Sequence, residues 1–259
     1  MQPSLLYDPD RLGRPAYHLW YTWTGWPSDT LFPSQPNPQF FNPLKADWKS
    51  DGIRILITEW SSEKIQIIGS VKPTASPVLF TARIKGRLQH ALRRADLATK
   101  FSRKVSFRSM GKNNQQKVEG YIRQQVRNEN FIDPRFEELM SRFTATHPDV
   151  KLEEPIATNS GRYWYNLHLV LVTENRFRFG DESSLSRICQ LCEGIADKKG
   201  YRISARSMMP DHIHLSLSGE IEQSPQEIAM AFMNNIAFGF GQRRIWRPSY
   251  YVGTFEDTI

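Results

Sequence analysis

The sequence predicts an α+β protein made of two tandem copies of one unit, each an antiparallel sheet with helices on one face. Three observations predict it: a length of 259 residues, an internal repeat, and the order of apolar segments in the second half. A chain of this length exceeds the usual single domain, so two domains are expected. Its content of 39% hydrophobic and 24% charged residues is typical of a soluble globular protein.

The repeat lies at an offset of 148 residues. Its anchors are Tyr17-His18-Leu19 with Tyr165-Asn166-Leu167, Arg54-Ile55 with Arg202-Ile203, Ile65 with Ile213, and Ser76-Pro77 with Ser224-Pro225. The repeat predicts a first unit over residues 1–129, a linker over 130–161 and a second unit over 162–259. The Asp133-Pro134 pair predicts a short helix in the linker.

Apolar spacing gives the second unit the element order β-α-β-β-α-β. Strands are expected at 164–173, 201–208, 212–218 and near 250–252, and helices at 184–199 and 225–238. This is the ferredoxin-like, or split βαβ, plan, which leaves one face of the sheet available for a ligand. Cys189 and Cys192 fall in the helix at 184–199 and are expected to be buried apolar residues.

The first unit departs from this plan near its start. Positions 28–50 should carry the first helix but contain Pro33, Pro36, Pro38 and Pro43. Because proline removes a backbone donor, an irregular insert is expected there. The unit should end with a strand at 105–108 and a polar helix at 115–127.

Two histidines stand two residues apart in the strand at 212–218. Alternate residues share a face, so His212 and His214 should project together and could converge on one divalent metal ion. A pair of solvated or hydrogen-bonded histidines is the alternative. Asp211 is expected either to orient one imidazole or to serve as a turn residue after Pro210.

The histidine pair and the candidate tyrosine fall in different units of the repeat. Lys64 and Gln66 occupy the positions of His212 and His214 in the first unit, which therefore lacks the histidine pair. The first unit instead carries a tyrosine on its polar helix, Tyr121. Aligning Phe107 with Val252 gives a local offset of 145, which would place a second copy of this tyrosine beyond Ile259.

The division favours a composite Tyr121–His212–His214 site over the alternative of an exposed helix tyrosine. Gln125 lies four residues after Tyr121 on the same helix face and could enter that site.

Four runs of the second unit carry a family resemblance: Lys199-Gly200-Tyr201, Met209-Pro210-Asp211-His212-Ile213-His214-Leu215, Ser224-Pro225 and Trp246-Arg247-Pro248-Ser249-Tyr250-Tyr251-Val252. Together they resemble the HUH single-tyrosine transposases of small insertion sequences and of repetitive extragenic palindromes. The resemblance covers nearly all of the second unit and, more weakly, the first. It implies Mg²⁺ or Mn²⁺ bound by His212, His214 and Gln125, with Tyr121 as the nucleophile.

The resemblance also implies how the units cooperate. Insertion-sequence members are commonly dimers in which the tyrosine helix of one subunit reaches the histidines of the other. This chain would then be a fused pseudodimer with one composite site, and a monomer. One site also argues against simultaneous cleavage of two DNA ends by one molecule.

The residue types suit strand transfer. A tyrosine with a pKa of about 10 is a weak nucleophile at neutral pH, and a metal that polarises the phosphate makes its attack easier. The products would be a 5′-phosphotyrosine and a free 3′-hydroxyl, and the covalent link allows rejoining without a nucleotide cofactor.

The charge predicts a polyanionic partner. The net charge is +7, and eleven cationic residues lie between positions 83 and 117 against one acid, Asp96. A solvated surface is the alternative. The expected DNA contacts are Arg83, Lys85, Arg87, Lys117, Arg123, Arg243 and Arg244, and for the last two a solvated loop is equally expected.

Three functions follow. The first is a metal-dependent single-stranded DNA endonuclease and strand transferase acting on hairpin-bearing DNA. The others are a domesticated non-catalytic DNA-binding protein and an RNA-binding module of the same architecture. Retention of the imidazoles and the tyrosine in opposite units favours the first. Residues 1–8 lack a secretory pattern and no apolar run has membrane-spanning length, so a cytoplasmic, nucleoid-associated location is expected.

Overall fold

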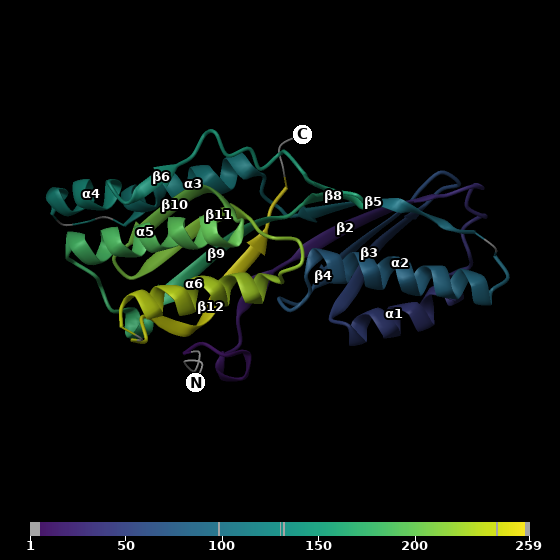
Figure 1. Ribbon diagram of the computed structural model, residues 1–259, viewed down its shortest axis with the longest axis horizontal. Coiled ribbons are helices and arrows are strands. Elements are labelled where there is room, and N and C mark those ends of the chain that lie inside the picture. Colours follow the sequence, from purple (N-terminus) through teal and green to yellow (C-terminus); the bar gives the residue numbers. More distant parts are fainter. Residues whose placement is uncertain (1–5, 98, 130, 132, 242, 257–259) are drawn as a thin grey trace.

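The computed structural model describes residues 6–97, 99–129, 131, 133–241 and 243–256. Two six-stranded sheets lie side by side along the long axis of the molecule (Figure 1). Residues 1–5, within the segment expected to lack a secretory signal, and linker residues 130 and 132 lie outside the described part. Among the helices of the described part, none is long and apolar enough to cross a membrane.

The second unit has the expected order of elements. They are β9 (Asn166–Thr173), α5 (Glu182–Lys199), β10 (Arg202–Met209), β11 (His212–Ser218), α6 (Pro225–Gly239) and β12 (Trp246–Thr254). The strands pair in the order β12-β9-β11-β10. Helix α6 begins at a capping box formed by Ser224 and Glu227, and α5 ends at Gly200, whose φ of 72° is easily reached only by glycine. The buried thiols of Cys189 and Cys192 are free, as expected.

The first unit repeats this topology, so the predicted pair of ferredoxin-like units is confirmed. Its elements are β2 (Trp20–Pro27), α1 (Phe41–Ser50), β3 (Ile53–Trp60), β4 (Ile65–Val71), α2 (Pro77–Arg94) and β5 (Phe101–Met110), in the strand order β3-β4-β2-β5.

The expectation of an irregular insert in place of the first helix was wrong. A 3₁₀ turn, η2 (Pro38–Phe40), leads directly into α1. Pro43 falls in the first turn of α1, where the helix requires no backbone donor. Leu44 and Trp48 then bury the inner side of α1 in the core.

Strand registers show the repeat and correct one of its anchors. Arg54 pairs with Ser70 as Arg202 pairs with Ser218. Both hairpins carry an irregularity at the same place, between Ile55 and Ile57 and between Ile203 and Ala205. Trp20 also pairs with Ser70, and Asn166 pairs with Ser218, so these two residues are equivalent. The alignment of Tyr17 with Tyr165 was therefore wrong by two residues, because hydrogen-bond register and not the shared Tyr-x-Leu pattern sets the equivalence.

The chain crosses between the sheets twice in the same way. Strand β1 (Ala16–His18) pairs in parallel with β12 of the second unit, and the chain then passes Leu19 into β2 of the first. Strand β8 (Gly161–Trp164) pairs in parallel with β5 of the first unit before Tyr165 leads into β9 of the second. Each crossing strand thus pairs with the last strand of the opposite unit and continues into a central strand of its own unit; β1 is the edge of its sheet, whereas β8 is followed by one further strand.

Equivalent hydrogen bonds hold the two crossings. The backbone N–H of Trp20 donates to Oγ1 of Thr254, and the backbone N–H of Asn166 donates to Oγ of Ser109, each at 2.9 Å. Both hydroxyls donate onward to a carbonyl of the opposite unit. Because both hydroxyl side chains are buried, these bonds satisfy donors that would otherwise lack a partner.

The segment between the units contributes to both sheets. Helix α4 (Pro134–Ser141) begins where expected, with the side chain of Asp133 capping it. Strand β6 (Thr144–Thr146) pairs with β10, whereas β7 (Ile156–Thr158) pairs with β8 at the edge of the first sheet. The limits 1–129, 130–161 and 162–259 stay a prediction.

Candidate active site

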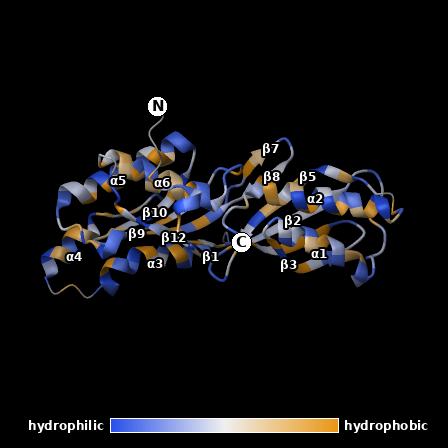
Figure 2. Ribbon diagram, turned by 90° about the horizontal axis from the view of Figure 1, so that it is seen from below, coloured by the Kyte–Doolittle hydropathy of each residue, from blue (hydrophilic) through white to orange (hydrophobic). Residues whose placement is uncertain are grey.

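Helix α3 (Gln115–Asn128) leaves the first unit and packs on the sheet of the second. It contacts β10, β11 and β6, on the side of the sheet opposite α5 and α6 (Figure 2). The crossing is fixed at its start, where the backbone N–H of Gln115 donates to the carbonyl of Glu256 at 3.0 Å. Val118 and Ile122 anchor the helix in a small apolar cluster with Ala205. The tyrosine helix of one unit therefore lies over the histidine strand of the other.

Tyr121 and the two predicted histidines meet under this helix. The ring centroid of Tyr121 lies 5.6 Å from that of His214, and the His212 and His214 centroids are 4.9 Å apart. The tyrosine is 49% exposed, whereas both imidazoles are buried in the open face of the sheet. This arrangement places a phenol that solvent can reach beside two adjacent imidazoles.

A third histidine, His168 on β9, belongs to the same cluster and was missed from the sequence. Its Nε2 lies 3.0 Å from Nδ1 of His214, and its ring centroid is 6.0 Å from that of Tyr121. In the sheet it pairs with Ser216, which shares the face of His214. The period-two pattern of 166–173 together with a β9–β11 pairing could have revealed it. The sequence interpretation treated that strand only through its apolar residues.

Asp211 orients the other imidazole. Its Oδ1 lies 2.6 Å from Nδ1 of His212, while its Oδ2 accepts from the guanidinium of Arg176 at 2.9 Å. Burial opposes ionisation of this carboxyl, but the two hydrogen bonds hold its pKa below the usual value. Asp211 also occupies the turn between β10 and β11, so both of its expected roles are compatible with its position.

The imidazoles of His212 and His214 thus each make a contact inside the protein through Nδ1. Within the described part of the chain, no hydrogen bond reaches Nε2 of His212 or His214. Burial lowers the pKa of His214 well below its usual value, and the two neighbouring histidines lower it further. Burial also lowers the pKa of His168 to about 4. These two imidazoles are therefore neutral at neutral pH, the form in which a histidine binds a metal.

The residues present fit a divalent metal with open coordination positions. His212 and His214 share one face of β11, and each ring is oriented through its Nδ1, as is usual for metal-binding histidines. In the described residues, no group of three or more His, Cys, Asp or Glu side chains is arranged to hold a metal ion. A third ligand would therefore come from a group of another kind, such as a side-chain amide or a solvent molecule.

Gln125, the third ligand expected from the resemblance, is almost fully buried one turn after Tyr121. Its side-chain amide donates to the carbonyl oxygen of Tyr121 at 3.1 Å. That bond uses the nitrogen and leaves the acceptor Oε1 for another partner. The role of Gln125 as a ligand stays a prediction.

A cavity of about 540 Å³ opens beside the cluster. It is lined by Asn113, Lys117, Val118, Tyr121, His168, Val170, His214 and Tyr251. Of the expected DNA contacts, Lys117 lies here, one turn before Tyr121. Arg123 lines a different cavity between α3 and α4, and the exposed residues Arg243 and Arg244 precede β12.

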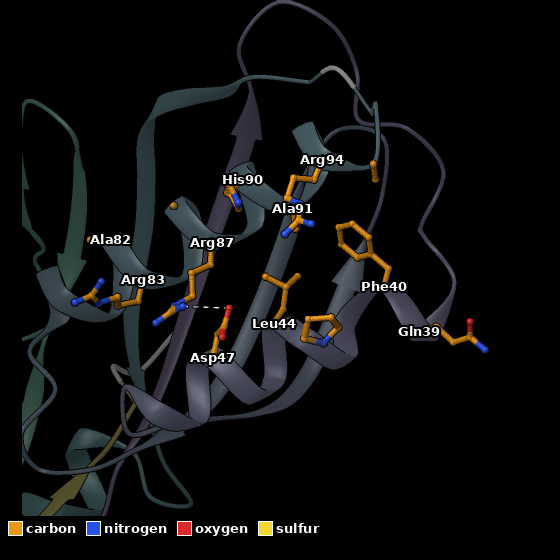
Figure 3. A pocket seen from close by; sticks show the side chains of 13 residues that line it. Gln39, Phe40, Leu44, Asp47, Ala82, Arg83, Arg87, His90, Ala91 and Arg94 are labelled. Carbon is orange, nitrogen blue, oxygen red and sulfur yellow. Dashed lines mark ion pairs between the residues drawn. The ribbon is translucent and has the colours of Figure 1, made fainter.

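The remaining expected DNA contacts lie in the first unit. Arg83, Lys85 and Arg87 are on α2, which packs on the first sheet, in the other half of the molecule from α3 (Figure 1). Arg83 and Arg87 line a cavity of about 590 Å³ between α1 and α2 (Figure 3). Arg87 forms ion pairs with Asp47 and Asp51, at 3.2 Å and 2.6 Å. Its charge is partly neutralised within the fold, so its contact with DNA stays a prediction.

Comparisons with known proteins concern mainly the second unit. Residues 162–258 match the family model described as "Transposase IS200 like". No curated protein matches the chain significantly.

Two solved structures share similarity over about a third of the chain. A structure assigned as a transposase from Deinococcus radiodurans R1 is 22% identical, with 34% of this chain and 75% of that chain covered and a TM-score of 0.32. A REP-associated tyrosine transposase bound to a REP hairpin is 13% identical, with 36% and 58% covered and a TM-score of 0.32. The match spans little more than half of the latter chain.

Proposed function

We propose that the chain is a metal-dependent single-stranded DNA endonuclease and strand transferase, a proposal supported by the match of residues 162–258 to the IS200-like transposase model. Its substrate would be hairpin-bearing DNA, and its reaction would be a step of DNA transposition or a process derived from it. The observation that carries the proposal is the position of Tyr121, whose ring lies 5.6 Å from that of His214 although the two residues belong to different units. A protein that only binds nucleic acid has no need for this juxtaposition.

In the proposed reaction, the Tyr121 hydroxyl attacks the scissile phosphorus. The bond from the phenolic oxygen to phosphorus forms as the bond from phosphorus to the 3′ oxygen breaks. The phenol loses its proton, and the departing oxygen gains one to become a free 3′-hydroxyl. The DNA remains attached through its 5′ phosphate, so attack by another 3′-hydroxyl reverses the step and joins a new pair of ends.

His212 and His214 would hold the metal ion through Nε2, with Gln125 as the proposed third ligand. A bound Mg²⁺ or Mn²⁺ ion would offset the negative charge that develops on the phosphoryl oxygens. Asp211 and His168 keep the two imidazoles in place through Nδ1. Lys117, on the same helix face as Tyr121, would contact the phosphate backbone at the entrance of the cavity.

The test is the formation of a covalent adduct. The protein is incubated with a pool of end-labelled, hairpin-bearing single strands and Mn²⁺, and the products are separated on a denaturing gel. We expect a labelled band that migrates with the protein and that disappears in Tyr121→Phe. EDTA should also prevent it.

Tyr251→Phe is a matched control, because Tyr251 lines the same cavity and is similarly exposed. Burial raises the pKa of its hydroxyl, which disfavours its ionisation at neutral pH. This variant should still form the adduct. No adduct across the pool, or one that persists in Tyr121→Phe, would contradict the proposed chemistry and favour a binding protein without catalysis.

A further inference from the structure

We propose that the open face of the first unit's sheet binds single-stranded DNA, as a continuation of the path that leads to Tyr121. The identity of the ligand rests on the proposed function, but the surface is a different one. It belongs to the unit that lacks the histidine pair.

The open face is defined by two rows of side chains across the strands. One row is Ile57, Ile68, Thr22, Arg108 and Trp164, and the other is Arg54, Ser70, Trp20 and Met110. Nearly all of these side chains are partly or fully exposed, whereas their neighbours along each strand are mostly buried in the core. In the described part of the chain, the helices with most contacts to this sheet are α1 and α2, which cover its core face. The sheet of the second unit, by contrast, has α3 on its open face.

Flat π-systems are the first feature that fits nucleic acid. The guanidinium of Arg108 lies 3.7 Å above the ring of Trp164. Trp20 is partly exposed on the neighbouring strand, and its ring centroid is 4.6 Å from that of His18. Single-stranded nucleic acids bind sheets of this kind through bases that stack on aromatic rings and on arginine planes.

Charge is the second feature. Arg54 and Arg162 are exposed on the open face, which also carries the acid Glu59. An excess of arginine over acid favours a phosphate backbone as the occupant. It disfavours a second copy of the same face, because like charges would then meet across the interface.

Continuity with the candidate active site is the third feature. His18 on β1 pairs with Gly253, which in turn pairs with His168, so these three residues lie in one row on the open face of the second sheet. Two residues further along the chain, at the start of β2, Trp20 lies on the open face of the first sheet. A single strand can therefore pass from the cavity beside Tyr121 across His18 to Trp20 without leaving the protein surface.

The experiment measures binding in the absence of chemistry. Fluorescence anisotropy of a labelled, unstructured oligothymidylate of about 15 nucleotides is recorded with the Tyr121→Phe protein in EDTA. Trp20→Leu keeps most of the apolar volume but removes the indole ring, and Arg108→Ala removes the guanidinium. Each should weaken binding by about fivefold or more, as expected for the loss of one stacked base. Trp20→Phe, which keeps an aromatic face, should retain most of the affinity.

Two variants serve as controls for the loss of exposed arginine or aromatic surface elsewhere. Arg135→Ala removes an exposed arginine of α4, and Phe238→Ala removes an exposed ring of α6. Both should bind the oligonucleotide as the parent protein does. Thermal unfolding of every variant shows whether a lost affinity reflects a lost fold.

Three results would overturn the inference. The first is parental affinity in both Trp20→Leu and Arg108→Ala. The second is binding of an RNA of the same length without binding of the DNA. The third is a dimer in analytical ultracentrifugation that Trp20→Leu dissociates, because the face would then be covered by a second copy. If the protein forms no covalent adduct but still binds oligothymidylate, the proposed chemistry is contradicted and the proposed DNA-binding surface is not.

Discussion

Replacing His168 by alanine should weaken divalent metal binding without removing a metal ligand. His214 can offer Nε2 to a metal only if its proton resides on Nδ1. That Nδ1 lies 3.0 Å from Nε2 of His168, so His168 must accept the proton and carry its own on Nδ1. His168 thereby selects the tautomer of His214 that can bind metal, and it also holds the ring in place.

The expected size of the effect follows from this single hydrogen bond. Loss of a partner that orients a metal-binding histidine typically lowers metal affinity about 10- to 100-fold, or about 1.4 to 2.7 kcal/mol. In His168→Ala, the imidazole of His214 can rotate and exchange between its two tautomers. The ligand set itself is unchanged, so binding should weaken and not disappear.

Titration of Mn²⁺ followed by electron paramagnetic resonance of the free ion measures this affinity without DNA. His168→Gln provides the matched control, because its side-chain oxygen can accept the same proton, and it should recover much of the affinity. An Mn²⁺ affinity in His168→Ala equal to that of the parent would refute this account of the cluster. So would equal losses in His168→Ala and His168→Gln.

Three further changes have defined outcomes. Asp211→Asn should weaken Mn²⁺ binding about 10- to 100-fold in the same titration, because the charged partner of His212 Nδ1 is replaced, and an unchanged affinity would show that Asp211 serves only the turn. Ser109→Ala should lower the free energy of unfolding by about 1 to 3 kcal/mol in urea, because the buried backbone N–H of Asn166 loses its acceptor. No loss there would mean that this crossing does not depend on the hydroxyl. Lys117→Ala should weaken DNA binding in EDTA and make the affinity less dependent on salt concentration, because one phosphate contact is lost. An unchanged salt dependence would show that Lys117 does not contact the DNA backbone.

The repeat made much of the fold predictable. Residue spacing alone gave the bounds of β11 and placed the starts of α3 and α6 correctly. The same pattern could not locate the crossings, because Tyr17 and His18 continue the alternation of β2 although they pair with β12 of the other sheet. Alternation of apolar and polar residues shows which face of a sheet a side chain lies on, but it does not show which strand its own strand pairs with. The first helix was missed for a related reason, because the effect of Pro43 depends on its position within the helix.

The candidate site was predictable where its residues form a local motif. His212 and His214 could be paired from their spacing, and the complementary loss across the repeat pointed to Tyr121. His168 and Arg176 reach the cluster only through the pairing of β9 with β11 and through the loop after β9. The alternation of β9 gives the face of His168, but without the strand pairing it does not show that this face meets His214. The expected basic contacts illustrate the reverse case, since Lys117 and Arg123 are close in sequence but face different cavities.

The central claim is that one chain assembles its site from its own two halves. Mixing Tyr121→Phe with His214→Ala tests it directly, because each variant keeps the group that the other lacks. If helix α3 serves the histidines of its own chain, the mixture should form no more covalent DNA adduct than either variant alone. Restoration of the adduct in the mixture would show that the tyrosine of one molecule reaches the histidines of another and would contradict this account.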